Sequence, residues 1–254
     1  MNQKIPYPTF GDPMFLLANF REQLLPFLPK NAHIAEVGVN MADLSRKILD
    51  QCAPAKLHLI DPWELSGADD DYAANIGHEA RTENAEERYE HVVKTVGPEM
   101  EAGVVKIHRA YSHDAIDNFE DESLDWVYID ANHQYEYVKK DLEMFLPKLK
   151  PDGLILGHDY ANNEMSRKYG FGVVEAVNEF CSEQNLDFMC LTFDPFPTYV
   201  LAKDPASAKA QQFLANVLYH LTPAIRIENF SAKKYQQVVV DFGGGTHRTI
   251  ISVD

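Results

Sequence analysis

The chain has 254 residues, of which 45% are hydrophobic and 24% charged, and its formal net charge at pH 7 is −16. This length suits one α/β domain with additions, and no apolar run approaches the roughly 20 residues that a membrane helix needs. The negative charge would repel a nucleic-acid backbone or an anionic membrane, so both partners are disfavoured.

The N-terminal segment, residues 1–30, is predicted to be helical. Apolar residues between positions 14 and 28 recur at helical spacing, and Pro29 ends the pattern, so we expect a leading helix ahead of a sheet. Residues 1–6 lack the apolar core of a secretory signal, and the three cysteines are too scattered for a disulfide framework. These features predict a cytoplasmic protein with reduced, mostly buried thiols.

Between residues 31 and 204, short apolar runs alternate with longer helical patterns, which is typical of parallel βαβ units. The acidic run at 69–71 is interpreted as a solvated loop, and a helix is expected near residues 172–182. The pattern predicts a Rossmann-like, doubly wound α/β sheet. Seven strands are expected, at residues 33–37, 56–60, 104–108, 124–129, 153–157, 188–192 and 198–202.

Beyond Pro205 the character of the sequence changes. Residues 206–221 are alanine-rich and predict a helix, and residues 238–242 and 246–253 predict a β-hairpin across three glycines. We interpret residues 205–254 as a C-terminal appendage that could form a homodimer contact or a substrate-binding element.

A glycine turn follows the first predicted strand. Glu36 lies near the end of the strand, and Gly38 and Asn40 lie in the turn, where backbone N–H groups and a helix N-terminus can face a ligand. The turn has one glycine and lacks the G-x-G-x-x-G fingerprint, so a ligand without a pyrophosphate is favoured. A purely structural turn is the alternative interpretation.

Two further loops complete this candidate pocket. Asp61, Pro62 and Trp63 end the second strand about twenty residues past the glycine turn, where Rossmann-like folds hold an acid against ribose hydroxyls. A turn-forming role for Asp61 ahead of Pro62 is the alternative. Tyr111 and Ser112 follow the third strand, where they either lie beside a base or form a plain loop.

The most specific block combines D-x-x-H-x-Y-x-x-V-x-x-D at residues 130–141, L-K-P-x-G at 149–153 and H-D-Y at 158–160. This block resembles the class I S-adenosylmethionine-dependent methyltransferases. It is most similar to the small-molecule O-methyltransferase branch, which includes the macrocin and mycinamicin sugar methyltransferases and the cephalosporin hydroxylase-like proteins. The resemblance covers about residues 32–203 and implies a seven-stranded, mostly parallel sheet whose last strand is antiparallel. It implies S-adenosylmethionine as cofactor, bound by Glu36, Gly38, Asn40, Asp61, Pro62, Trp63, Tyr111, Ser112 and Asp130.

Asp130 and Asp159 end the fourth and fifth predicted strands, so a parallel sheet should bring both carboxylates to one edge. Two such carboxylates can share Mg²⁺ or another divalent cation, which would bind an acceptor hydroxyl and lower its pKa. His133 lies one turn beyond Asp130, and a histidine that titrates near neutral pH suits a general base. The resemblance implies the same roles, although some metal-dependent relatives have an extra acid or amide beside the second aspartate, whereas the neighbours here are His158 and Tyr160. Helix capping by the aspartates and a structural His133 are the alternatives.

These features predict metal-assisted O-methylation of a small-molecule or sugar hydroxyl, with Asp130 and His133 as the catalytic residues. One rival is a nucleotide-dependent Rossmann oxidoreductase, which the single-glycine turn disfavours. The other is a non-catalytic S-adenosylmethionine-binding module, because a retained fold does not guarantee a retained activity.

Overall fold

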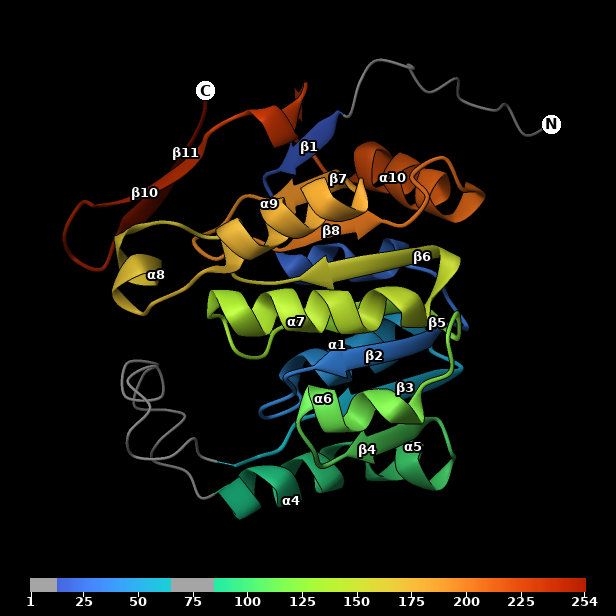
Figure 1. Ribbon diagram of the computed structural model, residues 1–254. Coiled ribbons are helices and arrows are strands. Elements are labelled where there is room, and N and C mark those ends of the chain that lie inside the picture. Colours follow the sequence, from blue (N-terminus) through green and yellow to red (C-terminus); the bar gives the residue numbers. More distant parts are fainter. Residues whose placement is uncertain (1–12, 65–84) are drawn as a thin grey trace.

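The computed structural model describes residues 13–64 and 85–254, so residues 1–12 and the acidic run at 69–71 lie outside the described residues. Within the described chain, nine strands form one mixed sheet (Figure 1). In their order across the sheet they are β4 (Val105–His108), β3 (Lys56–Ile60), β2 (His33–Val37), β5 (Leu124–Ile129), β6 (Leu149–Gly157), β8 (Tyr199–Ala202), β7 (Asp187–Thr192), β1 (Met14–Leu17) and β9 (Ala224–Ile227).

The seven strands predicted from the sequence all form, and β8 runs antiparallel to both β6 and β7, as expected for the last of them. The strands β2, β3 and β5 begin and end where predicted, because each is a short apolar run bounded by turn residues. The prediction of a seven-stranded sheet is wrong, because β1 and β9 extend it beyond β7. The Rossmann-like α/β architecture itself is confirmed.

The N-terminal segment also differs from the prediction, because residues 14–28 do not form a helix. Met14–Leu17 is the strand β1, parallel to β7 and antiparallel to β9, and the short 3-10 turns η1 (Arg21–Gln23) and η2 (Leu25–Phe27) follow it. Both ends of β1 are fully buried, and periodicity alone cannot distinguish a short buried strand from a helix. Pro26 lacks the N–H that a helix interior needs, so it prevents a continuous helix.

Helices cover both faces of the sheet (Figure 1). Side chains alternate along each strand, so Trp126 and Tyr128 of β5 face one layer, and Val127 and Ile129 face the other. The first layer contains α1 (Asp43–Cys52), α4 (Ala85–Thr95) and α10 (Ala208–His220), and the second contains α6 (Ser112–Ala115), α7 (Tyr135–Phe145) and α9 (Val173–Gln184). The three cysteines are free and buried. Among the described helices, none is long and apolar enough to cross a bilayer.

Short elements connect these layers. They are α5 (Gly97–Glu101), α8 (Glu164–Lys168), η3 (Ile116–Asn118), η4 (Leu146–Lys148) and η5 (Phe230–Ala232).

The chain beyond Pro205 contributes a strand to the sheet and contacts the loop that follows β6. The predicted helix is α10, and the predicted hairpin consists of β10 (Tyr235–Asp241) and β11 (His247–Val253). Between them, β9 pairs with β1 at the edge of the main sheet. The backbone N–H of Gln237 in β10 donates to Asn162, in the loop that follows β6, at 2.9 Å. This contact joins the hairpin to the loop that begins at the end of β6.

Candidate active site

A pocket of about 670 Å³ lies at the carboxyl edge of the parallel strands. The strand order reverses between β2 and β5, and ligands of open α/β sheets bind at such a switch point. Trp63 does not line this pocket. It is buried, and its Nε1–H donates to the carbonyl of Asn40 at 2.9 Å. The other predicted cofactor residues line the pocket: Glu36, Gly38, Asn40, Asp61, Pro62, Tyr111, Ser112 and Asp130.

Contacts of the backbone fix the conformation of the glycine turn after β2. Gly38 has φ +88°, and a Cβ there would lie 2.0 Å from the carbonyl oxygen of Asp130, so no other residue fits without moving the backbone. Asp61 accepts hydrogen bonds from the N–H groups of Val39 and Asn40, both at 2.9 Å. The carboxylate of Asp61 therefore holds the turn in place, a structural role close to the turn-forming alternative that the sequence left open.

Glu36 forms the floor of the pocket. Its side chain is only 1% exposed, and its Oε2 atom has no hydrogen-bond partner among the described residues. Burial raises the pKa of Glu36 to about 8, and the charges of Asp130 and Arg21 act on it in opposite directions. A buried carboxyl oxygen without a partner is costly, so this position favours a ligand that can donate to Oε2.

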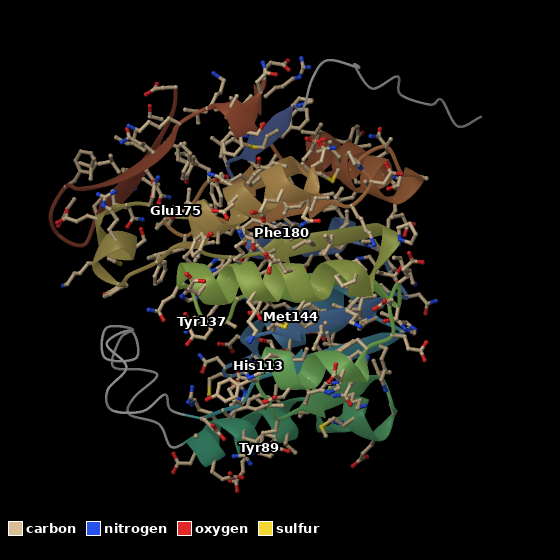
Figure 2. All side chains as sticks on the ribbon, in the orientation of Figure 1. Tyr89, His113, Tyr137, Met144, Glu175 and Phe180 are labelled. Atoms are coloured by element: carbon tan, nitrogen blue, oxygen red, sulfur yellow. The ribbon has the colours of Figure 1, made fainter. Side chains whose placement is uncertain are left out.

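Residues of α6 and α7 form the opposite side of the pocket. Ser112 donates from its hydroxyl to Asp141 at 2.6 Å, and burial raises the pKa of Asp141 to about 6. Tyr137, near the start of α7, and His113, in α6, also line the pocket and are more exposed (Figure 2). Asp141 was not predicted as a site residue, although it is the last aspartate of the D-x-x-H motif and that position was a usable signal.

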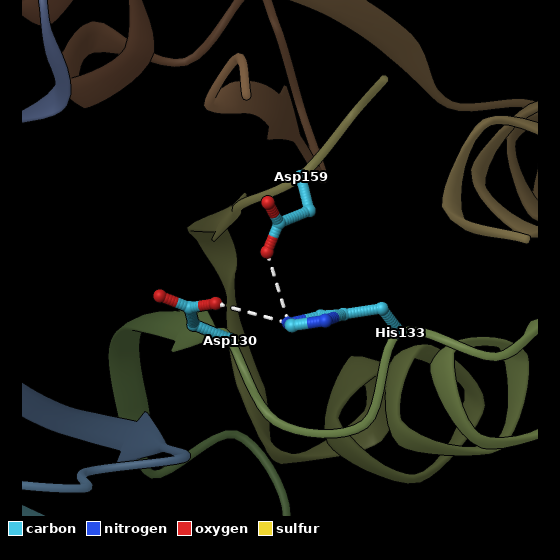
Figure 3. A group of neighbouring side chains, drawn as sticks. All are labelled: Asp130, His133 and Asp159. Atoms are coloured by element: carbon cyan, nitrogen blue, oxygen red, sulfur yellow. Dashed lines mark hydrogen bonds and ion pairs between the residues drawn. The ribbon is translucent and has the colours of Figure 1, made fainter. Parts of the chain in front are cut away.

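Asp130, His133 and Asp159 meet at one end of the pocket, where Asp130 and His133 line it and Asp159 lies behind the lining (Figure 3). Nε2 of His133 lies 2.9 Å from Oδ2 of Asp159 and 3.4 Å from Oδ1 of Asp130. Nδ1 of His158 lies 3.3 Å from the same oxygen of Asp159. These positions follow from the fold, because β5 and β6 are parallel neighbours that end at the same edge. We call the cluster of Asp130, His133, His158 and Asp159 the reaction end of the pocket.

The charges at the reaction end shift the pKa values of its members. Burial alone would raise the pKa of Asp130, but His158 and His133 outweigh burial and hold it below its ordinary value. The pKa of Asp159 is also lowered against burial, chiefly by His133. Burial lowers the pKa of His133, yet the two carboxylates outweigh burial and raise it to about 10. His133 is therefore protonated at neutral pH in this arrangement, whereas we expected from the sequence that it titrates near neutral pH.

Arg21 reaches the reaction end from η1 and was not predicted. Its Nη1 donates to Oδ2 of Asp130 at 2.7 Å and to the hydroxyl of Tyr128 at 3.2 Å. It approaches Asp130 because η1 follows β1, whose pairing with β7 and β9 could not be inferred from local pattern. Nothing in the spacing of Arg21 along the chain signals this contact.

The donor atoms at the reaction end fit a divalent cation. Asp130, His133 and Asp159 each offer one ligand atom, and these atoms all lie within 4.8 Å of one another. Carboxylate oxygens are the ligands that Mg²⁺ prefers, and a nearby imidazole also suits transition metals. Arg21 binds one oxygen of Asp130, which leaves the other oxygen, Oδ1, directed toward the cluster.

A comparison with protein families identifies the domain that contains most of this pocket. Residues 36–160 match a family model described as a methyltransferase domain, an interval that includes the glycine turn and the whole of the Asp130, His133 and Asp159 cluster. The chain belongs to the class I S-adenosylmethionine-dependent methyltransferases. The expected cofactor of this methyltransferase is S-adenosylmethionine. The resemblance predicted from the sequence is confirmed at this level, and the sugar-methyltransferase branch stays a prediction.

Solved structures share the fold of this methyltransferase. An O-methyltransferase family protein from Burkholderia thailandensis matches with a TM-score of 0.50 and 11% identity, over 73% of this chain and 56% of that one. A candidate sarcosine dimethylglycine methyltransferase from Galdieria sulphuraria matches with a TM-score of 0.50 and 9% identity, over 72% of this chain and 82% of that one. At these identities the likeness shows the fold alone. Over 60 residues, 24% of this chain, the methyltransferase is 43% identical to the uncharacterized protein y4gI from Sinorhizobium fredii, and the match covers 6% of that protein's length.

Proposed function

We propose that this methyltransferase moves the methyl group of S-adenosylmethionine to a hydroxyl oxygen of a small-molecule or sugar acceptor. The proposal rests on the position of His133, whose Nε2 lies between the carboxylates of Asp130 and Asp159 at 3.4 and 2.9 Å. A hydroxyl must lose its proton when its oxygen is methylated, and an imidazole in the pocket can accept that proton. The net charge of −16 favours a small acceptor over a nucleic acid.

The proposed reaction balances with these groups. A lone pair of the acceptor oxygen attacks the methyl carbon, the carbon–sulfur bond breaks, and its electron pair returns to the sulfur of S-adenosylhomocysteine. The hydroxyl proton moves to Nε2 of a neutral His133. Most of the rate gain comes from holding oxygen, carbon and sulfur in line, because a bimolecular attack then becomes effectively unimolecular.

The chain around His133 fixes the direction of its ring. Phe171 packs against the imidazole with ring centroids 4.6 Å apart, and the N–H of Gly172 donates to the carbonyl of His133 at 2.8 Å. Asp130 and Asp159 hold the ring from the opposite edge. These contacts come from different chain segments, so the imidazole is positioned before an acceptor binds.

Asp130 and Asp159 would hold the divalent cation that the resemblance implies, Mg²⁺ or another. When bound, this cation would lower the pKa of an acceptor hydroxyl and would supply the positive charge that protonated His133 otherwise provides between the carboxylates. His133 can accept a proton only in its neutral form. The charges at the reaction end therefore determine whether His133 can act as the base.

Methyl transfer can be tested as release of S-adenosylhomocysteine with a panel of glycosides and phenols, with and without a chelator. We expect Asp159→Asn to lower turnover roughly 100-fold or more while it still binds S-adenosylhomocysteine, because it removes one of the two carboxylates at His133. Asp117→Asn is the matched control, since Asp117 is exposed and lies outside the pocket. We expect chelation to lower wild-type turnover to the level of Asp159→Asn.

Each alternative predicts a different result. Wild-type turnover in the chelator would exclude the cation, and wild-type turnover of Asp159→Asn would exclude the carboxylate pair. A protein that S-adenosylhomocysteine stabilises against heat but that methylates no hydroxyl acceptor would support the non-catalytic module. Stabilisation by NAD and not by S-adenosylhomocysteine would support the oxidoreductase.

A further inference from the structure

Three loops lie beside the reaction end on the side of the sheet away from β2. They follow β1, β6 and β7, which all run in one direction, because β6 and β7 are both antiparallel to β8 and β1 is parallel to β7. The strand β5 is parallel to β6, so these loops leave the same edge of the sheet as Asp130 and Asp159. Ligands of open α/β sheets bind at this edge.

Aromatic side chains are concentrated in these three loops. Phe20, after β1, is 60% exposed, and Phe193, after β7, is 37% exposed. Phe196, in the loop between β7 and β8, and Tyr169 and Phe171, in the chain after β6, are half-buried. We call these five residues the aromatic rim. Aromatic side chains that stay partly exposed at a ligand-binding edge favour an apolar ligand.

The aromatic rim is in contact with the catalytic histidine. The ring of Phe171 packs against His133, with centroids 4.6 Å apart. Phe196 and Tyr169 lie on either loop beside Phe171, at centroid distances of 6.1 and 6.2 Å. A ligand that stacks on these rings would therefore lie next to the imidazole.

The other two members of the rim are joined to the reaction end through β1. The backbone N–H of Phe193 donates to the carbonyl of Leu17, the last residue of β1, at 2.7 Å. Phe20 precedes Arg21, whose guanidinium group binds Asp130 at 2.7 Å. These contacts hold the loops after β1 and β7 together at the same edge.

The buried polar side chains of these loops already have partners. Asn163 is 1% exposed and donates to the side chain of Gln237 at 2.7 Å. Asp194 accepts from the hydroxyl of Thr192 at 2.8 Å and from the N–H of Phe196 at 2.9 Å. A sugar is recognised through several hydrogen bonds to side chains, and these groups are engaged elsewhere. The rings of the rim are better suited to stack on a planar molecule.

We propose that the aromatic rim binds a planar aromatic acceptor, so that the methylated molecule is a phenol and not a sugar. The acceptor ring would stack on Phe196 and Phe171, and its hydroxyl would lie at His133. The phenol oxygen would attack the methyl carbon of S-adenosylmethionine, its proton would pass to neutral His133, and S-adenosylhomocysteine would leave. The inference rests on the proposed function and narrows its acceptor class.

Turnover of two acceptors tests the class. Naphthol is the planar probe and methyl glucoside is the sugar probe, and release of S-adenosylhomocysteine is measured with each. We expect kcat/KM to be roughly 10-fold or more higher for naphthol. Methoxybenzene and methoxycyclohexane resemble a methylated product and differ in planarity. As competitive inhibitors against naphthol, methoxybenzene should bind roughly 3- to 10-fold more tightly, which is the range expected for one aromatic contact.

Substitutions of Phe196 separate recognition of the acceptor from support of the loop. Phe196→Leu keeps an apolar side chain but removes the ring, so the KM of naphthol should rise roughly 3- to 10-fold while kcat stays within about twofold. Phe196→Tyr keeps the ring and should return the KM to near the wild-type value. Tyr219→Leu is the matched control, since Tyr219 is an exposed aromatic residue of α10, outside these loops. It should leave KM and kcat unchanged.

The outcomes distinguish the acceptor class from methyl transfer itself. A protein that methylates the glucoside and not naphthol would overturn the inference, while transfer to a hydroxyl oxygen would stand. Equal inhibition by the two methoxy compounds, or an unchanged KM of naphthol in Phe196→Leu, would also overturn it, because the rim would then not bind the acceptor ring. A protein that methylates neither acceptor would contradict the proposed function together with the inference.

Discussion

The two ends of the pocket are built in different ways. One is the end at the turn of Gly38 and Asp61, where the cofactor is expected to bind and which we call the cofactor end, and the other is the reaction end. At the cofactor end, contacts of the backbone fix the structure. Gly38 packs against the backbone of Asp130, and the carboxylate of Asp61 accepts hydrogen bonds from two N–H groups of the turn. At the reaction end, side chains from three chain segments meet, including Arg21, His133 and Asp159. A change at the first end should therefore affect stability and cofactor binding, and a change at the second should affect turnover.

His133→Gln should produce the largest effect and should confine it to turnover. Glutamine keeps a polar group near the two carboxylates but cannot accept the proton, so kcat should fall roughly 10²- to 10⁴-fold. The affinity for S-adenosylhomocysteine, measured by calorimetry, should stay near the wild-type value. A parallel loss of kcat and of this affinity would show that the two ends do not act separately.

Gly38→Ala should damage the cofactor end through the backbone. Its Cβ would lie 2.0 Å from the carbonyl oxygen of Asp130, so we expect the free energy of unfolding to fall by about 3 kcal/mol or more. Gly170→Ala is the matched control, because Gly170 also has positive φ but a Cβ there would meet no atom of the described residues within 4 Å. It should cost about 1 kcal/mol, which is the strain of the left-handed conformation. Equal losses in urea denaturation would contradict the steric argument.

The parts of the fold that were predicted are those encoded by contiguous sequence. The strands β2 and β3 and the glycine turn after β2 follow from apolar runs and turn residues. The strands β1 and β9 were missed because each depends on a partner far along the chain. Ala224–Ile227 is also mostly exposed, so it has no apolar alternation to detect.

The same distinction applies to the candidate site. Asp130 and His133 are three residues apart and Asp159 ends the next strand, so a parallel sheet was enough to bring them together. Arg21 depends on the position of β1, which local sequence does not encode. Trp63 was expected in the pocket, but its ring is buried against Tyr89, at a centroid distance of 5.3 Å. The direction of a side chain after a strand end was not predictable from the spacing of residues.

Histidines outside the pocket should respond to pH in the opposite direction from His133. His58 and His108 share a hydrogen bond of 2.9 Å, and burial lowers the pKa of each to about 4. The stability that this pair contributes is therefore complete above pH 6.5 and is lost as the pH falls toward 4, because the unfolded chain binds protons first. The raised pKa of His133 contributes stability that is complete below pH 6.5 and is lost as the pH rises toward 10.

His58→Gln should reduce the loss of stability that the protein shows as the pH falls. Between pH 7 and 4.5, its free energy of unfolding should fall by about 2 kcal/mol less than that of the wild-type protein, as measured by urea denaturation. His91→Gln is the control, since His91 is an exposed residue of α4, and it should follow the wild-type curve. A wild-type protein whose stability does not change over this range would contradict the lowered pKa values.

Gln237→Ala should produce the smallest effect and should extend the comparison to the hairpin that contacts the loop after β6. Its side chain is 2% exposed, accepts a hydrogen bond from Asn163 at 2.7 Å and donates to the carbonyl of Asp194 at 2.9 Å. Loss of these bonds should cost about 1 kcal/mol of stability. Gln236→Ala, at the exposed neighbouring position of β10, should cost less than about 0.5 kcal/mol. Because Asn163 is the N-cap of α8, in the segment that follows β6 and Asp159, we also expect Gln237→Ala to raise the KM of the acceptor and leave the binding of S-adenosylhomocysteine unchanged. An effect on cofactor binding alone would show that the hairpin supports the other end of the pocket.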